Sequence, residues 1–555
     1  MMSFNNSPFQ RLFCPFALAA AGIFAGNIML AQTAHSTLTA SEIHTSHAFE
    51  AAKKLGAPEL YALLKPMPKG ADLHMHLSGA VYAETFIAEG IKQGLCVAAV
   101  DPGMPAVPEG QNAVRFVVPD HATPCGHGQV PAAEALQRQS LYDDLIDSFS
   151  MRGYVPTPGF TGHDQFFATF DRFRSVNISN AGEWLDEVAS RAAAQNEQYL
   201  EIMQTPTFTH AATLGYKIGW PAGAEKIITP AQLANLRDAL LAGGLRDEVA
   251  VNSKELADAE ITRRSMEGCD RVQSKTTVTV PRTASPCDVR THWLYQVLRG
   301  FPPQQVFAQT LLGFEVASAD PDVVGVNFVM PEDGRFSMQD YHLQMQMLHY
   351  LHSVYPKVRL SLHAGEIAPG MVTPDGLRFH IREAIDLGHA ERIGHGMDVL
   401  YEDHPAELLK EMADKHVMVE INLTSNDVIL GLSRTDHPLA AYRAAHVPVA
   451  LSTDDEGVSR IDLTHEYVKG AEEQGLTYKD LKDMARTSLE HAFLAGESLW
   501  ASPDDFARRK TACIAPIAPT SEPTSSCAAF LKSSERATEQ WELERRFAVF
   551  ESSIH

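Results

Sequence analysis

The 555-residue chain has no low-complexity tract, no solenoid-type repeat and no Cys-x-x-Cys pair. The first two absences exclude a disordered chain and a repeat array, and the third argues against a cysteine metal site. Positive charge is also scarce, because 46 Lys and Arg stand against 69 Asp and Glu, which gives a formal net charge of −23. Such a surface repels phosphate backbones and anionic lipid, so we expect no nucleic-acid partner and no binding to a membrane surface.

Long apolar runs are absent except near the N-terminus. There, Arg11 precedes an apolar run, and small residues follow it at 31–34. This order predicts a secretory signal peptide over residues 1–34. An uncleaved membrane anchor is the alternative, although Pro15, Gly22 and Gly26 interrupt the run. We therefore expect an exported protein, periplasmic or extracellular, with no stable membrane association after cleavage.

Export changes what the seven cysteines predict. Cys14 leaves with the signal peptide, and the remaining six form three sequence-local pairs in loop-like surroundings. In an oxidising compartment, this proximity predicts three disulfides, although six cysteines allow many other pairings. The predicted pairs are Cys96 with Cys125, Cys269 with Cys287, and Cys513 with Cys527.

Short apolar runs alternate with helical patterns along most of the chain. The runs are ADLHMH, QYLEIMQT, THWLYQVLR, VVGVNFVM, RLSLHAGE, ERIGHG, VMVEINLTSN and VPVALSTDD. This alternation predicts an α/β fold, a (β/α)8 TIM barrel over residues 67–500. A doubly wound open sheet is the alternative, but no glycine-rich loop follows the first run.

Segments outside the alternation predict additions to the barrel. Residues 35–66 resemble a helical lead-in, and residues 501–555 a loop followed by an amphipathic helical tail that packs. Two insertions are expected, at about 97–132 and about 208–285. The first is rich in Pro, Gly and Ala and predicts a long loop; the second predicts one helix, at 230–244, and loops.

Histidines and carboxylates follow several of these runs. His74 and His76 end the first, His363 the fifth, and Asp454 the eighth. In a barrel, the carboxyl ends of all strands face one mouth, so these residues can converge. Three neutral imidazoles and one carboxylate suit a single Zn²⁺ with an open position, and bound zinc lowers the pKa of water toward about 7.

Three more residues at the same strand ends can manage protons. Glu366 lies three residues past His363, near enough to touch a substrate without binding metal. His395 can orient or deprotonate water, and Asp455 can bind substrate or relay a proton. Each motif alone has an ordinary explanation as a turn or a helix cap. Their occurrence together, in this order, favours a catalytic mononuclear site.

The motifs LHMHLSGA, HAGE, RIGHG and STDD, in this order, resemble the adenosine deaminase family of metal-dependent amidohydrolases. The segment MPKGADLHMHLSGA and the N-terminal apolar run resemble the secreted, growth-factor-type branch. The resemblance covers about residues 67–500. It implies attack at C6 of adenosine or 2′-deoxyadenosine, with release of ammonia and formation of inosine or 2′-deoxyinosine.

The resemblance also implies roles for single residues. It implies zinc ligation by the three histidines and Asp454 named above. It further implies that Glu366 protonates purine N1, that His395 assists the attacking hydroxide and that Asp455 hydrogen-bonds N7. The segment GHDQFFATFDRF resembles the family's lid, so Phe166, Phe167 and Phe170 are either an apolar wall over the purine or core residues at helical spacing.

Two positions depart from the family pattern. Ser78 stands where cytosolic members carry an aspartate that contacts ribose, and Met330 replaces a glycine whose backbone holds purine N3. A Gly→Met change keeps the backbone donor but narrows the pocket. The residues expected to contact substrate are Ser78, Gly79, Phe167, Met330 and Asp455.

Several alternatives to an adenosine deaminase remain. A deaminase of adenine or of a nucleotide shares the chemistry, but a nucleotide needs a basic clamp, for which Arg460 is a lone candidate. A two-metal amidohydrolase often carries a carboxylated lysine near the fourth strand, and VVGVNFVM has none. An inactive binding or signalling protein would have lost a ligand or Glu366. The expected partner is a small-molecule purine nucleoside, and a homodimer is possible.

Overall fold

The computed structural model describes residues 39–100, 113–120, 125–177, 181–269 and 285–554. The chain divides into two units, Met1–Leu38 and Thr39–His555, and the described residues belong to the second. The predicted signal peptide at 1–34 lies outside the described residues.

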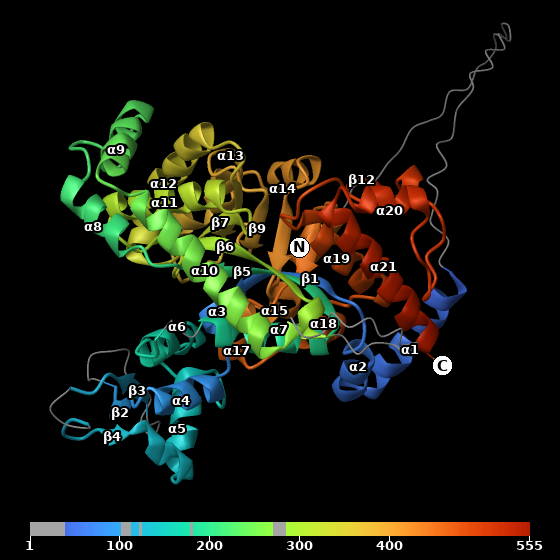
Figure 1. Cartoon of the computed structure of the whole chain (residues 1–555), viewed down its shortest axis with the longest axis horizontal. Coiled ribbons are helices and arrows are strands. Elements are labelled where there is room, and N and C mark those ends of the chain that lie inside the picture. The colour runs from blue at the N-terminus through green and yellow to red at the C-terminus, as the bar shows by residue number, and fades with distance from the viewer. Residues whose placement is uncertain (1–38, 101–112, 121–124, 178–180, 270–284, 555) are drawn as a thin grey trace, which may run out of the picture. The chain divides into compact units, whose positions relative to one another are not determined.

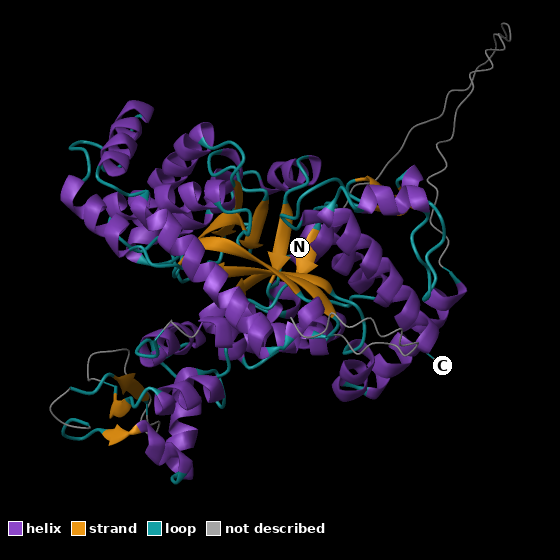
Figure 2. Ribbon diagram, in the orientation of Figure 1, coloured by secondary structure: helices purple, strands orange, loops and turns teal. Residues whose placement is uncertain are grey.

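Eight parallel strands in the described part of the chain form one sheet that closes on itself (Figures 1 and 2). In the order in which they pair, they are β1 (Gly70–His76), β5 (Glu197–Gln204), β6 (Arg290–Leu298), β7 (Val323–Val329), β8 (Arg359–Ala364), β9 (Arg392–His395), β10 (Met418–Ile421) and β11 (Val449–Leu451). The Asp454 amide, just past β11, donates to the His74 carbonyl of β1 at 2.8 Å and closes the ring. The predicted barrel is confirmed, and each strand lies on one of the eight predicted runs.

Helices surround the strands, which are orange in Figure 2. The helices that follow or connect barrel strands are α3 (Leu77–Ala80), α4 (Ala83–Lys92), α5 (Gln139–Phe149), α6 (Gly162–Phe173), α7 (Ala181–Ala194), α11 (Pro303–Ala319), α12 (Arg335–Val354), α13 (His380–Asp386), α14 (Pro405–Asp414), α15 (Leu423–Leu430), α16 (Leu439–Ala444), α17 (Glu456–Ser459), α18 (Leu463–Glu473) and α19 (Tyr478–His491). Helix α11 shows why they form: Pro303 starts it, and every residue from Val306 to Phe314 is buried, as expected for a helix that is packed on all sides. Because helices cover the strands outside and side chains fill the barrel inside, the strands are buried on both faces.

The first insertion is not the long loop that we expected for about 97–132. Strands β2 (Cys96–Ala99), β3 (Val114–Val117) and β4 (Val130–Pro131) form a small antiparallel sheet, and a disulfide joins Cys96 to Cys125. The buried Phe116 packs directly against Gly90 of α4, which anchors the sheet. The sequence hid this sheet because its strands are short and far apart, so no hairpin signal joins them.

The second insertion also differs from the prediction. Besides the predicted helix α9 (Pro230–Ala242), it contains α8 (Thr209–Ile218) and α10 (Asp247–Met266). Helix α10 lacks an apolar stripe, and polar side chains are buried along it. Glu248 accepts the amide protons of His210 and Ala211 at the start of α8, and Arg263 pairs with Glu260 at 2.6 Å. A helix fixed by such polar contacts gives no periodic hydrophobic signal.

The chain ends carry the remaining elements. They are α1 (Ala40–Leu55), α2 (Ala57–Leu64), the hairpin β12 (Trp500–Ser502) and β13 (Asp505–Arg509), α20 (Ser525–Leu531) and α21 (Glu535–Ser553). The hairpin and α20 replace part of the loop expected after residue 500, and α21 buries Leu543, Phe547 and Phe550. The structure also contains the Cys269–Cys287 and Cys513–Cys527 disulfides, so all three predicted pairs are present.

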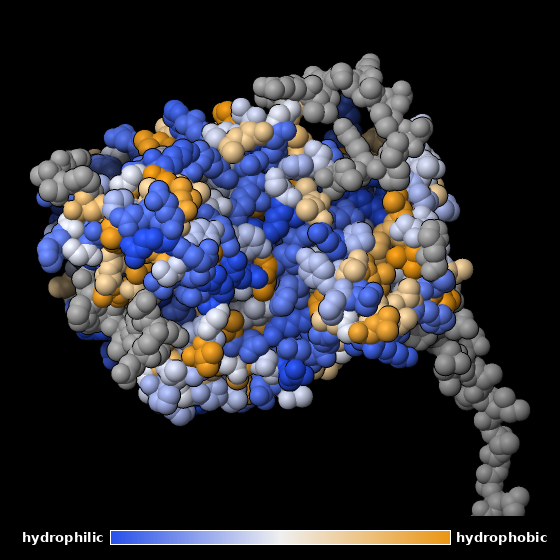
Figure 3. All heavy atoms as spheres, turned by 90° about the horizontal axis from the view of Figure 1, so that it is seen from below, coloured by the Kyte–Doolittle hydropathy of each residue, from blue (hydrophilic) through white to orange (hydrophobic). Residues whose placement is uncertain are grey.

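Apolar side chains are scattered over the face drawn in Figure 3, among larger polar areas. Among the described residues, none of the helices combines the length and the apolar character needed to cross a bilayer.

Candidate metal centre and active site

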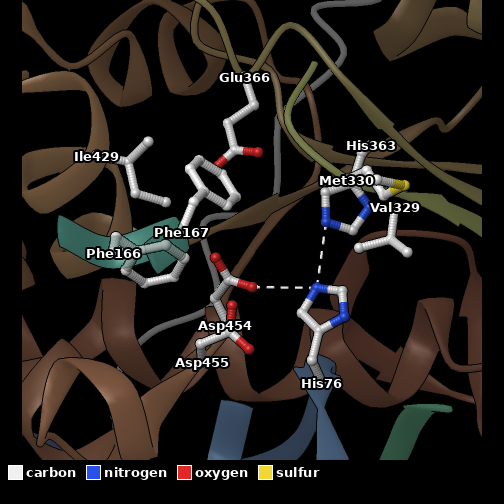
Figure 4. Close-up of a pocket in the computed structure, with 10 residues that line it drawn as sticks. All are labelled: His76, Phe166, Phe167, Val329, Met330, His363, Glu366, Ile429, Asp454 and Asp455. Atoms are coloured by element: carbon white, nitrogen blue, oxygen red, sulfur yellow. Dashed lines mark hydrogen bonds and ion pairs between the residues drawn. The ribbon is translucent and has the colours of Figure 1, made fainter. Parts of the chain in front are cut away.

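Three barrel strands bring four ligand atoms to one point at the mouth of the barrel. Because side chains alternate along a strand, His74 and His76 leave β1 on the same side, and His363 joins them from β8. The His363 Nε2 atom lies 3.1 Å from His74 Nε2 and 3.2 Å from His76 Nε2. The Asp454 Oδ1 atom lies 3.2 Å from His76 Nε2 and 3.5 Å from His74 Nε2 (Figure 4 shows the contacts of His76).

The second ring nitrogen of each histidine, Nδ1, makes a hydrogen bond to a side-chain oxygen. The Nδ1 atoms of His74, His76 and His363 contact Glu420 Oε2 at 2.6 Å, Gln296 Oε1 at 2.7 Å and Asn327 Oδ1 at 2.7 Å, respectively. Each partner atom is an acceptor, so each Nδ1 carries the ring proton. Each Nε2 therefore turns a lone pair toward the shared point, as in histidines that bind metals.

Lone pairs and a carboxylate oxygen this close together repel one another, and a cation between them would remove that repulsion. An ion about 2.0–2.1 Å from each ligand atom, with the four ligands at roughly tetrahedral angles, would separate them by about 3.3–3.4 Å and could still take a fifth ligand such as water. The four measured separations, 3.1 to 3.5 Å, bracket this value. The residues therefore fit a zinc ion with three nitrogen ligands and one oxygen ligand.

Negative charge surrounds the ligand atoms. Burial alone would lower the pKa of His74, but the charges of Asp454 and Glu420 raise it, so these two carboxylates favour positive charge at this point. Burial would raise the pKa of Asp454, but the adjacent His74 and His76 hold it well below its usual range. The two carboxylates therefore stay ionised and attract a cation into the site.

Backbone hydrogen bonds to Glu332 fix the position of Glu366 at the edge of this centre. The amides of Gly365 and Glu366 donate to the two carboxylate oxygens of Glu332, at 2.9 and 2.8 Å. Burial, reinforced by the charge of Asp454, raises the pKa of Glu366 well above its ordinary value. This shift favours the protonated form, so Glu366 is placed to act as a general acid.

His395, at the end of β9, faces the same centre and is fully buried. Its Nε2 lies 3.8 Å from Asp454 Oδ2, and its Nδ1 lies 3.7 Å from Glu366 Oε1. Burial, with the nearby His74 adding to it, lowers the pKa of His395 to about 3. The imidazole is therefore neutral at pH 7.

Asp455 lies beside the candidate metal ligand Asp454 and lines the pocket. Burial and the charge of Asp454 raise its pKa to about 7. A Cβ atom on Gly79 would lie 1.4 Å from Asp455 Oδ1, so only glycine allows the two segments to approach this closely. Asp455 Oδ1 is buried and has no hydrogen-bond partner among the described residues, which leaves it free for a ligand.

A pocket opens onto these groups. In Figure 4, Phe166 and Phe167 of α6 lie on one side of it, and Met330 and His363 on the other. Phe170 packs against the core instead. Ser78 is not among the described residues that line this pocket.

Met330 has a backbone φ of 97°, in the region that favours glycine. The Gly300 amide lies 3.3 Å from its sulfur atom, so the thioether is held against this turn. The candidate phosphate ligand Arg460 has a partner of its own, because its guanidinium binds the Glu84 carboxylate at 2.7 and 3.0 Å.

Residues 157–499 match the family model described as Adenosine deaminase. The chain belongs to the adenosine deaminase family. This confirms the resemblance seen in the sequence motifs, whereas membership of the secreted, growth-factor-type branch stays a prediction.

Curated relatives match this adenosine deaminase family member over part of their length. The adenosine deaminase of Clostridium perfringens (strain 13 / Type A) is 34% identical over 140 residues, which are 25% of this chain and 39% of that protein. The adenosine deaminase of Vibrio atlanticus is 24% identical over 227 residues, 39% of this chain and 60% of that protein. The chain thus spans about two to three fifths of the length of these relatives.

Solved structures also resemble this family member. The adenine deaminase from Arthrobacter aurescens has a TM-score of 0.47 and 17% identity, with 78% of this chain and 95% of that chain covered. The N6-methyl-AMP deaminase from Arabidopsis thaliana has a TM-score of 0.46 and 19% identity, with 79% and 95% covered.

The supporting residues Glu420, Gln296 and Asn327 were missed in the sequence. Each is a polar residue inside an otherwise apolar strand run, in VMVEINL, WLYQVL and VVGVNFV. A polar side chain in a strand buried on both faces needs a partner, and this signal could have identified all three.

Proposed function

We propose that this chain is an exported, zinc-dependent deaminase that converts adenosine or 2′-deoxyadenosine and water into inosine or 2′-deoxyinosine and ammonia. One observation carries the proposal: the three Nε2 atoms and the Asp454 carboxylate meet at zinc spacing beside Glu366, whose pKa is raised well above its ordinary value. When bound, zinc would lower the pKa of water toward about 7 and so supply hydroxide at neutral pH.

The chain's own residues divide the remaining work. Glu366 donates its proton to purine N1, which makes C6 more electron-poor. Hydroxide, assisted by His395, adds to C6. The hydroxyl proton of the adduct then passes to the exocyclic nitrogen as the C6 carbonyl forms and the bond from C6 to that nitrogen breaks, so that ammonia leaves. The proton that water releases in forming hydroxide restores Glu366. Asp455, whose pKa is near 7, carries the proton that a hydrogen bond to N7 needs.

The pocket walls support a purine substrate. Phe166 and Phe167 provide flat apolar surface for a base and keep bulk water from the reacting carbon. A nucleotide is less well supported, because Arg460 is paired with Glu84. Free adenine is the second candidate substrate, because Met330 lines the pocket where the family pattern has a glycine. An inactive scaffold is not favoured, because all four ligands and Glu366 are present and adjacent.

Ammonia release from a substrate panel tests this function. Purified, zinc-loaded protein is incubated with adenosine, 2′-deoxyadenosine, adenine and AMP, and E366Q protein is the matched control. We expect rapid release from the two nucleosides and almost none in the control. Preference for adenine would move the assignment to the second candidate. No release from any of the four would contradict a deaminase.

Export is supported by the three disulfides, which persist in oxidising compartments. N-terminal sequencing of the mature protein from the periplasmic or culture fraction should find a start near residue 35. Protein recovered only from the cytoplasm with free thiols would contradict export.

A further inference from the structure

A chain of hydrogen bonds leads from a backbone amide to the catalytic histidine. It begins at the first residue of α16, where the Leu439 amide lies 3.1 Å from His437 Nδ1. A backbone amide can only donate, so His437 Nδ1 is the acceptor and carries no proton. Burial lowers the pKa of His437 to about 3, so the ring is neutral and its single proton is on Nε2.

Asn426 of α15 continues the chain, with the same donor-to-acceptor direction, from His437 to His395. His437 Nε2 lies 3.2 Å from Asn426 Oδ1, so the histidine donates and the amide oxygen accepts. The amide nitrogen of Asn426 therefore faces His395 Nδ1, at 3.0 Å, and a second amide nitrogen, of Asn422, lies 3.4 Å from the same atom. Amide nitrogens only donate, so His395 Nδ1 is an acceptor and the ring proton is on Nε2.

The His395 Nε2–H group has no hydrogen-bond partner among the described residues, although it is buried. An unmet buried donor is destabilising, so such a group is usually aimed at something that binds beside it. Its nearest acidic neighbour is Asp454 Oδ2, at 3.8 Å, on the side of the metal ligands.

We propose that His437 and Asn426 are positioning residues that hold His395 as an Nε2–H donor toward the oxygen that attacks the substrate. The role of this donor rests on the proposed function; the tautomer does not. In this tautomer, Nε2 cannot take a proton from water, so His395 orients the attacking oxygen and stabilises the charge on it. Of the two roles that the sequence allows for His395, orientation and deprotonation, the geometry selects orientation.

Neutron diffraction on deuterium-exchanged crystals of the zinc-loaded protein tests the tautomer directly. We expect deuterium on Nε2 of both His395 and His437, and none on either Nδ1. Deuterium on Nδ1 of His395, alone or together with Nε2, would overturn the proposal. Neither outcome depends on the substrate. If no 6-aminopurine is deaminated but Nε2 carries deuterium, the proposed function fails and the tautomer assignment stands.

Three variants test the relay, which is the chain of hydrogen bonds from His437 through Asn426 to His395, by changing which groups donate and which accept. In N426D, the carboxylate only accepts, so it should draw the His395 proton to Nδ1 at nearly constant volume. Losing one donor to the reacting oxygen should lower kcat about 10²–10³-fold, with KM and zinc content nearly unchanged. H437L interrupts the relay and should also lower kcat. H437Q restores an acceptor and a donor, and we expect it to recover at least about tenfold of that loss.

The rescue separates positioning from simple packing. If H437L and H437Q lose kcat equally, or if N426D retains wild-type kcat, the relay does not set the tautomer and the proposal is wrong.

Discussion

Arg392 should control zinc affinity without touching the metal. Its Nε atom lies 2.6 Å from Glu420 Oε1, and the other oxygen of Glu420 holds His74 Nδ1 at 2.6 Å. The far side of the guanidinium lies 2.6 Å from Glu201 Oε2. Burial would raise the pKa of Glu420, but Arg392, with His74, lowers it to about 2. The arginine thus fixes both the charge and the direction of the carboxylate that orients a metal ligand.

The magnitude follows from what R392M leaves behind. Two fully buried carboxylates, Glu420 and Glu201, would lose their shared cation. Breaking a buried pair in this way costs about 3–5 kcal/mol of folding free energy. Loss of a group that orients a metal ligand typically costs about 10–100-fold in metal affinity, or about 1.4–2.7 kcal/mol.

Zinc competition with a chromogenic chelator measures the affinity, and urea unfolding measures the stability. The matched control is R359M. Arg359 packs on the same Phe493 ring, 4.0 Å from its centroid against 3.9 Å for Arg392, but pairs with the exposed Glu391. We expect R359M to keep wild-type zinc affinity and R392K to recover part of the loss. Folded R392M that binds zinc as tightly as wild type would refute the reasoning.

The remaining predictions concern the site itself. E366Q should retain zinc and lose at least about 10²-fold in kcat, because the amide cannot protonate purine N1; zinc analysis and ammonia release check this. H363A should lose both zinc and activity, so retained zinc stoichiometry would show that the ligand set is wrong. G79A should keep zinc but raise KM at least about tenfold, because its Cβ would lie 1.4 Å from Asp455 Oδ1 and displace that carboxyl; an unchanged KM would remove Asp455 from substrate binding.

The barrel could be predicted from the sequence because its strands are buried on both faces and appear as apolar runs. Residues near the ends of these runs could then be placed at one mouth by the fold rule for parallel barrels. That rule brought His363 and Asp454 next to His74 across long stretches of chain.

What could not be predicted depends on pairing between distant segments. The sequence gives no sign that Asn426 faces His395, or that Arg392 lies between Glu420 and Glu201, because these contacts are fixed only when the barrel closes. Helix α10 was missed for a related reason, since polar partners from other elements, and not an apolar face, hold it in place.

The central claim is that one divalent cation lies among His74, His76, His363 and Asp454. Anomalous diffraction at the zinc edge, on crystals of protein purified without chelators, tests it most directly. We predict a single strong peak per chain, about 2.0–2.2 Å from the three Nε2 atoms and from one Asp454 oxygen. A peak elsewhere, two peaks in the pocket, or no peak after zinc loading would contradict the account.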